Sequence, residues 1–248
     1  MQLSSPFCPS CRENLARNGD SFTCSKCGRV YPTKSGIVDF LTSLPLTDTQ
    51  KTVQITFDSI AGAYDNAIVR LVESLSCPWN VYTGRLEAFM STTGAKVILD
   101  VGCGTSFPIV SFLPQTSIYL GMDISLEMLM HAKSLLGDNL NAALWNIDAE
   151  RIPLPDNCVD VCLALMAFNV FPNPSKAAEE MLRILKKDGS VFGTVFIQSP
   201  PEEILNENPV DPLRLRKVLS VFDPGAWDLS FETQGGILFF SLKKSPKI

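Results

Sequence analysis

The sequence predicts an α/β protein in which a mostly parallel sheet, covered by helices on both faces, ends in an antiparallel hairpin. From residue 96 onward, continuous apolar runs alternate with helical patterns, which is typical of parallel strands buried on both faces. Near the C-terminus, two β-like segments flank Gly235-Gly236, as in a hairpin. Four paired cysteines before residue 45 indicate a small N-terminal appendage.

The predicted parallel strands are five apolar runs, at residues 96–101, 117–123, 142–148, 159–166 and 190–197. Helical patterns lie between them at 126–137 and 175–189, and the second is expected to end at Gly189, because glycine is common just after a helix. The hairpin is expected within 227–244. A dinucleotide dehydrogenase would instead continue with further strand–helix units.

Three segments follow from this pattern. Residues 1–45 form the cysteine-paired appendage, residues 46–95 a helical lead-in and lid, and residues 96–248 the α/β unit. A chain of 248 residues can bury the core of one such unit. No apolar run reaches the roughly 18 residues of a membrane helix, and the polar start is not a signal peptide, so we expect a cytoplasmic protein with no membrane partner.

The net charge of −5 is unevenly distributed. Residues 1–45 carry five basic and three acidic residues, a net charge of +2, so the remaining residues carry 16 basic and 23 acidic residues, a net charge of −7. Binding to a phosphate backbone needs a basic surface, and the large unit does not provide one. Nucleic acid is therefore disfavoured as a partner.

The appendage carries a metal-binding pattern. Cys8 and Cys11 form one C-x₂-C pair, and Cys24 and Cys27 form another after twelve intervening residues. This spacing lets four thiolates reach one tetrahedral ion, and Gly28 permits the tight turn beside them. We expect structural Zn²⁺, since four thiolates leave no open position; iron in a rubredoxin-like site and a redox pair are the alternatives. The other four cysteines lie scattered in apolar surroundings, as buried thiols in a reducing compartment do.

A glycine-rich turn follows the first strand of the α/β unit. Asp100 is followed by Gly102, Cys103 and Gly104, and glycine lets the backbone turn sharply and approach a ligand closely. Asp123, at the end of the next strand and 23 residues after Asp100, can accept hydrogen bonds from both hydroxyls of a ribose. Together they predict a nucleoside cofactor at this edge.

The same segments resemble the class I S-adenosylmethionine (SAM)-dependent methyltransferases, and within them the ubiquinone/menaquinone-biosynthesis-like family, over roughly residues 55–200. The matching motifs are FDSIAGAYD (57–65), ILDVGCGTS (98–106), GMDISLEML (121–129), NIDAERIPLPDNCVD (146–160) and EEMLRILKKDG (179–189). The resemblance implies a Rossmann-like sheet with SAM as cofactor. Residues 8–41 further resemble the zinc ribbons of the tRNA-methyltransferase activator family.

The resemblance also implies roles for single residues. The methionine part of SAM would be bordered by Asp100, Gly102, Cys103 and Gly104, with Leu165 next to the sulfonium. Asp123 would bind the ribose, and Tyr64 would close over the cofactor. Ile124 and Met128 would pack on adenine, and Asp148, beside Ala149, would accept from the adenine amino group. Simpler roles stay open: a strand-end cap for Asp100, a helix N-cap for Asp123, and core packing for Met128 and Leu165.

The sequence identifies no catalytic base. Its one histidine, His131, lies in the helix after the second strand, which does not face the acceptor in the resembling family. Methyl transfer would then depend on proximity, orientation and desolvation. Candidates for the acceptor pocket, each of which core packing would also explain, are Trp79, Tyr82, Phe168, Asn169, Phe171, Phe222 and Trp227, the last two in an insertion at 198–228.

Three functions remain open from the residues. A small, apolar or aromatic acceptor molecule is favoured by the acidic α/β unit and the aromatic candidates. An RNA methyltransferase of the ribosomal-RNA guanine type would use the ribbon cations Arg12, Arg17, Lys26, Arg29 and Lys34. A noncatalytic scaffold that keeps the fold is the third. The residues specify neither the acceptor nor an oligomeric state.

Overall fold

The computed structural model describes residues 6–137, 141–201, 221 and 227–244. In these residues eleven strands form one sheet in the order β1-β2-β3-β4-β7-β6-β5-β8-β9-β11-β10. The strands are β1 (Leu15–Asn18), β2 (Ser21–Cys24), β3 (Val30–Lys34), β4 (Ile37–Asp39), β5 (Val97–Val101), β6 (Ile118–Asp123), β7 (Ala142–Asn146), β8 (Val159–Leu165), β9 (Leu185–Phe196), β10 (Trp227–Gln234) and β11 (Ile237–Lys244).

The centre of the sheet is parallel and its two ends are antiparallel. Strands β4, β7, β6, β5, β8 and β9 pair in parallel. Strand β11 inserts antiparallel between β9 and β10, and β1 to β4 form an antiparallel meander. The predicted parallel strands and the terminal hairpin are confirmed. Strand β4 also joins the ribbon segment to β7, so the N-terminal meander continues the main sheet.

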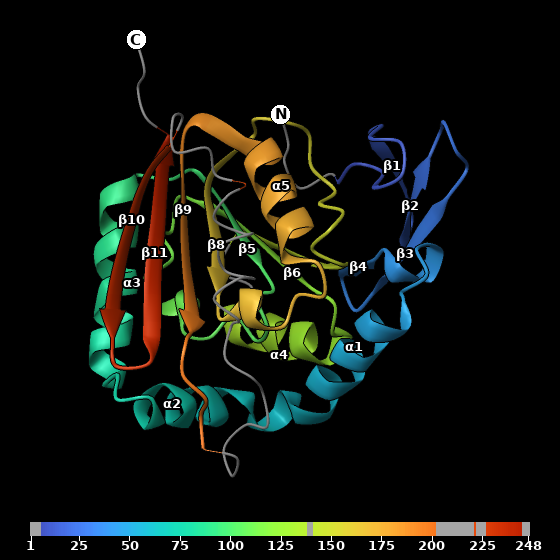
Figure 1. The fold of residues 1–248 in the computed structure, drawn as a ribbon. Coiled ribbons are helices and arrows are strands. Elements are labelled where there is room, and N and C mark those ends of the chain that lie inside the picture. Colours follow the sequence, from blue (N-terminus) through green and yellow to red (C-terminus); the bar gives the residue numbers. More distant parts are fainter. Residues whose placement is uncertain (1–5, 138–140, 202–220, 222–226, 245–248) are drawn as a thin grey trace.

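Five α-helices lie in the described part of the chain: α1 (Asp48–Ile60), α2 (Tyr64–Ser74), α3 (Trp79–Thr93), α4 (Leu126–Leu136) and α5 (Pro174–Ile184). Helix α5 lies on one face of the sheet, α3 and α4 lie on the other, and α1 and α2 run along the edge at which β8 and β9 end (Figure 1). Short 3₁₀ turns occur at Leu41–Ser43, Ala61–Ala63, Ile109–Phe112 and Ala167–Asn169. No helix of this set is long and apolar enough to cross a membrane.

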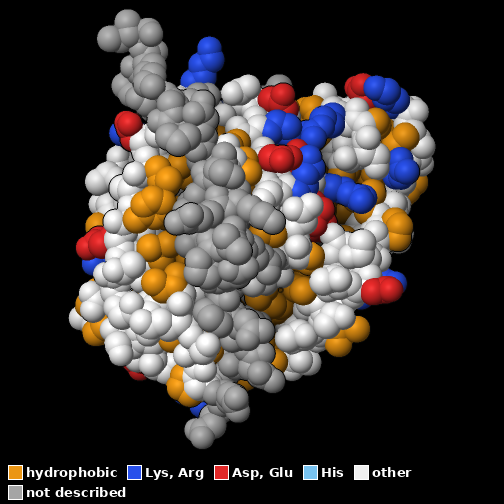
Figure 2. Space-filling model, in the orientation of Figure 1, with side chains coloured by type: hydrophobic (Ala, Val, Ile, Leu, Met, Phe, Trp, Pro, Cys, Tyr) orange, Lys and Arg blue, Asp and Glu red, His pale blue; other side chains and the backbone are white. Residues whose placement is uncertain are grey.

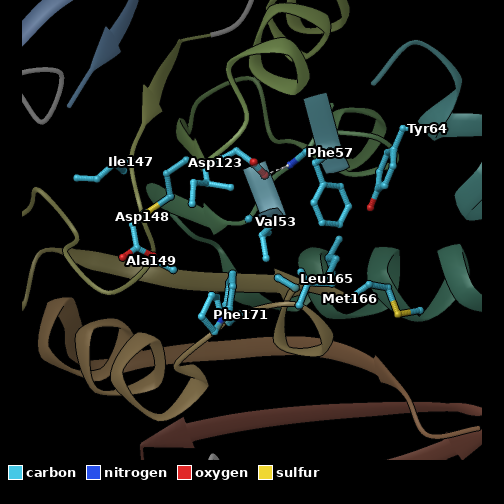
Figure 3. A pocket seen from close by; sticks show the side chains of 17 residues that line it. Val53, Phe57, Tyr64, Asp123, Ile147, Asp148, Ala149, Leu165, Met166 and Phe171 are labelled. Carbon is cyan, nitrogen blue, oxygen red and sulfur yellow. Dashed lines mark hydrogen bonds between the residues drawn. The ribbon is translucent and has the colours of Figure 1, made fainter. Parts of the chain in front are cut away.

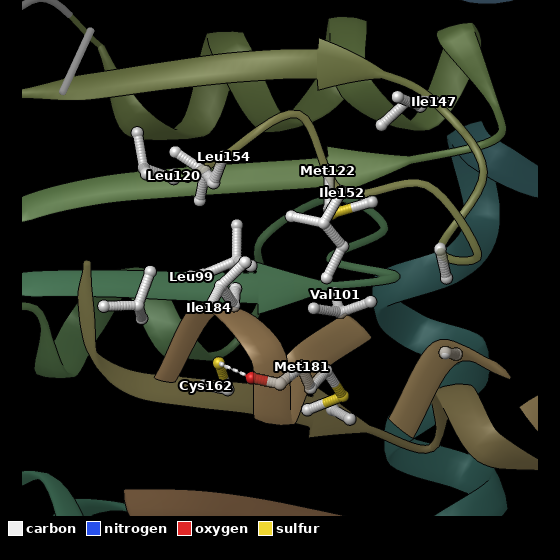
Figure 4. Close-up of a cluster of buried hydrophobic side chains, with 14 of the residues drawn as sticks. Leu99, Val101, Leu120, Met122, Ile147, Ile152, Leu154, Cys162, Met181 and Ile184 are labelled. Atoms are coloured by element: carbon white, nitrogen blue, oxygen red, sulfur yellow. Dashed lines mark hydrogen bonds between the residues drawn. The ribbon is translucent and has the colours of Figure 1, made fainter. Parts of the chain in front are cut away.

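Alternating side chains of the strands form two separate cores. On β5, Leu99 and Val101 enter the core under α5 (Figure 4), whereas Ile98 enters the core against α2, α3 and α4. Successive side chains of a strand point to opposite faces, so a strand buried on both faces is apolar throughout. This arrangement explains the continuous apolar runs of the sequence.

The end of α5 differs from the prediction. Asn173 caps the helix by accepting from Lys176 N, and Pro174 occupies its first turn. The helix ends at Ile184 rather than at Gly189, because the buried Leu185 already pairs with Val159 of β8. Gly189 therefore lies in β9. Helix α4 ends at Leu136 and is capped by Gly137, as expected.

Candidate functional site

A cavity of about 620 Å³, including its open mouth, lies at the carboxyl edge of the parallel strands (Figure 3). Loops after β5, β6, β7 and β8 form its floor and sides, and helix α1 contributes one wall. Its lining residues are Val53, Phe57, Tyr64, Gly102, Gly104, Met122, Asp123, Ile124, Ile147, Asp148, Ala149, Leu165, Met166, Ala167, Val170, Phe171 and Pro172. No lysine, arginine or histidine belongs to this described lining.

The turn after β5 brings bare backbone to the cavity. Gly102 and Gly104 have φ angles of 71° and 52°, which side chains adopt only with strain. A Cβ atom on Gly102 would lie 2.9 Å from the Cβ of Ala167, so only glycine fits there. The amides of Gly102 and Cys103 donate to Met122 O at 2.8 and 3.0 Å, which holds the turn beside the end of β6.

Asp123 lies at the end of β6 and faces the cavity (Figure 3). Its Oδ2 accepts from Gly104 N at 2.9 Å and its Oδ1 accepts from Ser125 N at 2.8 Å. Burial raises the pKa of Asp123 to about 6, against the lowering effect of these two amides. The N-cap of α4 is Ser125 and not Asp123, so the capping alternative for Asp123 is wrong.

Asp100 lies in a smaller adjoining cavity of about 340 Å³, which shares Tyr64, Gly102 and Leu165 with the first. Its Oδ2 accepts from the Tyr119 hydroxyl at 3.0 Å, whereas its Oδ1 is buried and has no hydrogen-bond partner among the described residues. Burial raises the pKa of Asp100 to about 7. A buried carboxylate oxygen without a donor is costly, so this atom fits a ligand with an ammonium group.

Asp148 follows β7 and faces the opposite end of the main cavity (Figure 3). Its Oδ2 accepts from Gln50 Nε2 at 2.7 Å, and burial raises its pKa to about 6. Ala149, Ile124 and Ile147 provide apolar surface next to it. This end of the cavity therefore offers a carboxylate within an apolar slot, which suits a planar base with an exocyclic amino group.

The structure brings most of the predicted cofactor residues to these two cavities. Tyr64, Gly102, Gly104, Asp123, Ile124, Asp148, Ala149 and Leu165 line the first, and Asp100 and Cys103 line the second. Met128 lines neither: it is fully buried in the first turn of α4, where its N–H donates to Ser125 Oγ. The expectation that Met128 packs on adenine is therefore wrong, because its side chain lies in the core.

Some lining residues were expected only as part of a segment. The sequence assigned residues 55–90 and 166–171 to the acceptor pocket, and Phe57, Val170 and Phe171 of these segments line the cavity. Val53 of α1 and Pro172 of the loop after β8 lie outside both segments and were not predicted. Val53 is four residues before Phe57 on the same helix face, a spacing that could have indicated a wall of the site.

The other acceptor candidates have mixed positions. Tyr82 lines the smaller cavity and bonds to Thr194 Oγ1 at 2.9 Å, while Trp79 stacks on Tyr82 and on Phe107. Phe168 and Trp227 are buried in the core, and Asn169 holds the backbone of Phe196 through two hydrogen bonds. Phe222 and most of the insertion at 198–228 lie outside the described residues. His131 is exposed on α4 and lines neither cavity.

The four paired cysteines converge at one point. Their sulfur atoms lie within 4.8 Å of one another, with 3.3 Å between Cys11 and Cys24 and 3.7 Å between Cys8 and Cys27. Zn–S bonds of about 2.3 Å in a tetrahedron place sulfur atoms roughly 3.8 Å apart, so the cluster fits such an ion. Gly28 has a φ of 72° and donates to Cys24 O, which closes the second turn.

An ion-pair network joins this cluster to the α/β unit. Arg12 follows Cys11 and donates to Glu180 Oε1 at 2.9 Å, and Arg183 binds both oxygens of Glu180. The Glu180 side chain is only 5% exposed and also accepts from Ile152 N. Figure 2 shows the resulting group of basic side chains between α5 and the ribbon strands. Burial raises the pKa of Glu180, but the hydrogen bonds and charges of Arg183 and Arg12 outweigh this effect and hold the pKa below its ordinary value.

Comparison with known proteins places this site in context. Residues 99–193 match the family model described as a methyltransferase domain. An uncharacterized chloroplastic methyltransferase of Arabidopsis thaliana is 26% identical over 220 residues, covering 78% of this chain and 62% of that protein. A malonyl-[acyl-carrier protein] O-methyltransferase of a Marinomonas species is 29% identical, covering 60% of this chain and 58% of its own length. The chain thus spans about 60% of the length of these relatives.

A solved structure has the same fold. The complex of DhpI with S-adenosylhomocysteine (SAH) superposes with a TM-score of 0.60 at 17% identity, covering 82% of this chain and all of that chain. At this identity the likeness concerns the fold alone.

Proposed function

Because the chain contains a class I SAM-dependent methyltransferase domain, we propose that it transfers the methyl group of SAM to a small, apolar or aromatic molecule. The observation that carries this proposal is the cavity at the carboxyl edge, where three buried carboxylates face otherwise apolar walls without a described cation. SAM carries ammonium and sulfonium charges, two ribose hydroxyls and an adenine amino group, all of which suit carboxylate partners.

The residues present fit this cofactor in a definite order along the edge. Asp100 would hold the ammonium group through the oxygen that has no partner within the described chain. Asp123 would accept from the ribose hydroxyls, and Asp148 from the adenine amino group. When bound, SAM supplies an electrophilic methyl group on its sulfonium. This order places Leu165 and Tyr64, which line both cavities, between the methionine and ribose ends.

The chain's own contribution to transfer is to position the acceptor and exclude water. Phe57, Phe171 and Leu165 form an apolar wall from α1, from the loop after β8 and from the end of β8. A nonpolar acceptor held there would lose its water and approach in line, and such orientation can supply a large part of the rate. Transfer would use an acceptor that is itself a good nucleophile, or one that an aspartate or tyrosine of the lining deprotonates.

One relative supports a small acceptor within this scheme, namely a demethylmenaquinone methyltransferase of Clavibacter sepedonicus, whose named substrate is a small molecule. Another relative, a malonyl-[acyl-carrier protein] O-methyltransferase, has a named substrate that is attached to a carrier protein. We retain the ubiquinone/menaquinone-biosynthesis-like family as the proposed subfamily and the cytoplasm as the proposed location.

RNA has weaker support as the substrate, because the ribbon cations are engaged within the chain. Three of them pair with carboxylates: Arg12 with Glu180, Lys26 with Glu13 and Lys34 with Asp39. Arg17 lies over the ring of Phe22, and Arg29 contacts the Cys27 thiol. The three cations that already pair with carboxylates release fewer counterions to a phosphate backbone, which weakens the support for RNA.

The cysteine cluster is proposed as a structural Zn²⁺ site. Four sulfur atoms at tetrahedral spacing support it, and strands β1 to β4 are too short to hold themselves together by burial alone. Its attachment through Glu180 and β4 supports a stabilising role rather than a catalytic one.

Calorimetry with SAM and SAH tests the proposal, followed by a screen of small apolar acceptors and of RNA with methyl-labelled SAM. Binding in the micromolar range and label transfer to an apolar molecule are expected. Label transfer to RNA would favour the ribosomal-RNA alternative instead. Absence of binding to either SAM or SAH would indicate the noncatalytic scaffold.

A further inference from the structure

Gln50 is a buried polar residue of α1 that contacts the cavity wall. It is 6% exposed, and its partner Asp148 is 8% exposed. The contact joins residues 98 positions apart, from the lead-in helix to the loop after β7. A buried amide at this place needs partners for both of its ends, so its hydrogen bonds are informative.

The helix cap dictates the orientation of the Gln50 amide. Gln50 is the third residue of α1, and its Oε1 accepts from Thr47 N at 2.8 Å in a capping box. The amide oxygen must face that donor, so the NH₂ group must face Asp148 Oδ2, which it meets at 2.7 Å. One oxygen of Asp148 is thereby occupied. Within the described chain, Oδ1 accepts a long hydrogen bond of 3.4 Å from Glu150 N, and Ala149 N is a further backbone donor to the carboxylate.

We propose that Gln50 is a positioning residue that aims the Asp148 carboxylate at the 6-amino group of a purine, which makes selectivity for adenosine over inosine depend on helix α1. This inference rests on the proposed function. A carboxylate accepts from the 6-amino group of adenine but repels the 6-oxo group of hypoxanthine. A carboxylate that can rotate or take up water loses this discrimination, whereas one held by a fixed donor keeps it.

Three variants separate the positioning role of Gln50 from its role in the helix cap. Gln50→Glu keeps an oxygen that accepts from Thr47 N, and glutamate is itself common at this position of a capping box, but it removes the donor to Asp148. Thr47→Val removes the hydroxyl that accepts from Gln50 N and donates to Gln50 Oε1 at 3.0 Å, yet it leaves Thr47 N, at 2.8 Å from the same oxygen, as the donor that orients the Gln50 amide. Gln50→Met, of similar length and without charge, checks that the first variant does not act by repulsion alone.

The experiment measures the Kd of SAH and of S-inosylhomocysteine for the full chain and the three variants by calorimetry, with thermal unfolding as a check on folding. We expect the affinity ratio of the two ligands to fall about tenfold in Gln50→Glu and Gln50→Met, and to stay within about twofold of the unaltered chain in Thr47→Val.

A ratio that is unchanged in both Gln50 variants, or that falls equally in Thr47→Val, would overturn the inference. Failure of the unaltered chain to bind SAH would instead refute the proposed function. The two failures are therefore distinguishable.

Discussion

Replacement of Asp123 by alanine tests the cofactor site most directly. Asp123 lines the cavity and uses both carboxylate oxygens on backbone amides, from Gly104 and Ser125. Each oxygen has further lone pairs for the hydroxyls of a ribose. We expect Asp123→Ala to weaken SAM binding strongly while leaving the chain folded.

The structure sets the expected magnitudes. The pKa of Asp123 is raised from 3.8 to about 6 even with the lowering effect of both amides, so its ionised form costs the folded chain a net free energy of about 3 kcal/mol at neutral pH. Alanine removes this cost but leaves the amides of Gly104 and Ser125 without their acceptor, which costs about 1–3 kcal/mol each. The free protein should therefore lose at most about 3 kcal/mol. Loss of two ribose contacts should weaken binding by about 100-fold.

Calorimetric titration with SAM and SAH at pH 7.5 and a thermal melt measure both quantities. The matched control is Asp58→Asn, which removes a neighbouring acid that bonds to Ser125 Oγ at 2.6 Å but does not line the cavity. Its affinity for SAM should stay within about threefold of the unaltered chain. An Asp123→Ala variant that is folded and binds SAM with near-normal affinity would refute the ribose assignment.

Three further outcomes are expected. SAM affinity should fall as the pH is lowered from about 8 to about 5, because Asp100, with a pKa of about 7, loses the charge that attracts the ammonium group, and Asp148, with a pKa of about 6, becomes a weaker acceptor for the adenine amino group. Because these pKa values are raised in the folded chain, ionisation of the carboxylates is costly there, and the free protein should lose stability as the pH rises. A Kd for SAM that stays independent of pH in calorimetry would contradict the predicted fall in affinity. Chelation should release one metal ion per chain and expose residues 6–45 to hydrogen exchange, whereas a metal-free ribbon that stays protected would exclude structural zinc. Glu180→Ala should cost about 3 kcal/mol in urea unfolding, because Arg183 would keep Asp156 but lose both oxygens of Glu180, and Ile152 N would lose its acceptor. A loss below about 1 kcal/mol would show that the network is dispensable.

Much of the candidate site could be predicted because its residues follow buried strands. Asp100 and Asp123 lie at or next to the ends of consecutive parallel strands, and such ends meet at one edge of a sheet. The glycines at 102 and 104 marked the turn for a local reason, since a positive φ excludes most side chains. The clustering of Cys8, Cys11, Cys24 and Cys27 was equally readable from spacing.

By itself, the sequence predicted strands β5 to β8, most of β9 and the terminal hairpin, the glycine turn after β5, and the carboxylates of Asp100 and Asp123 at the strand ends. Only the tertiary structure decided what joins distant segments: β4 pairs with β7, Gln50 holds Asp148, and α5 ends early because Leu185 pairs with β8. The physical reason is range. Periodicity and turn chemistry act between neighbours in the chain, whereas pairing and burial depend on residues that come together only when the sheet has formed.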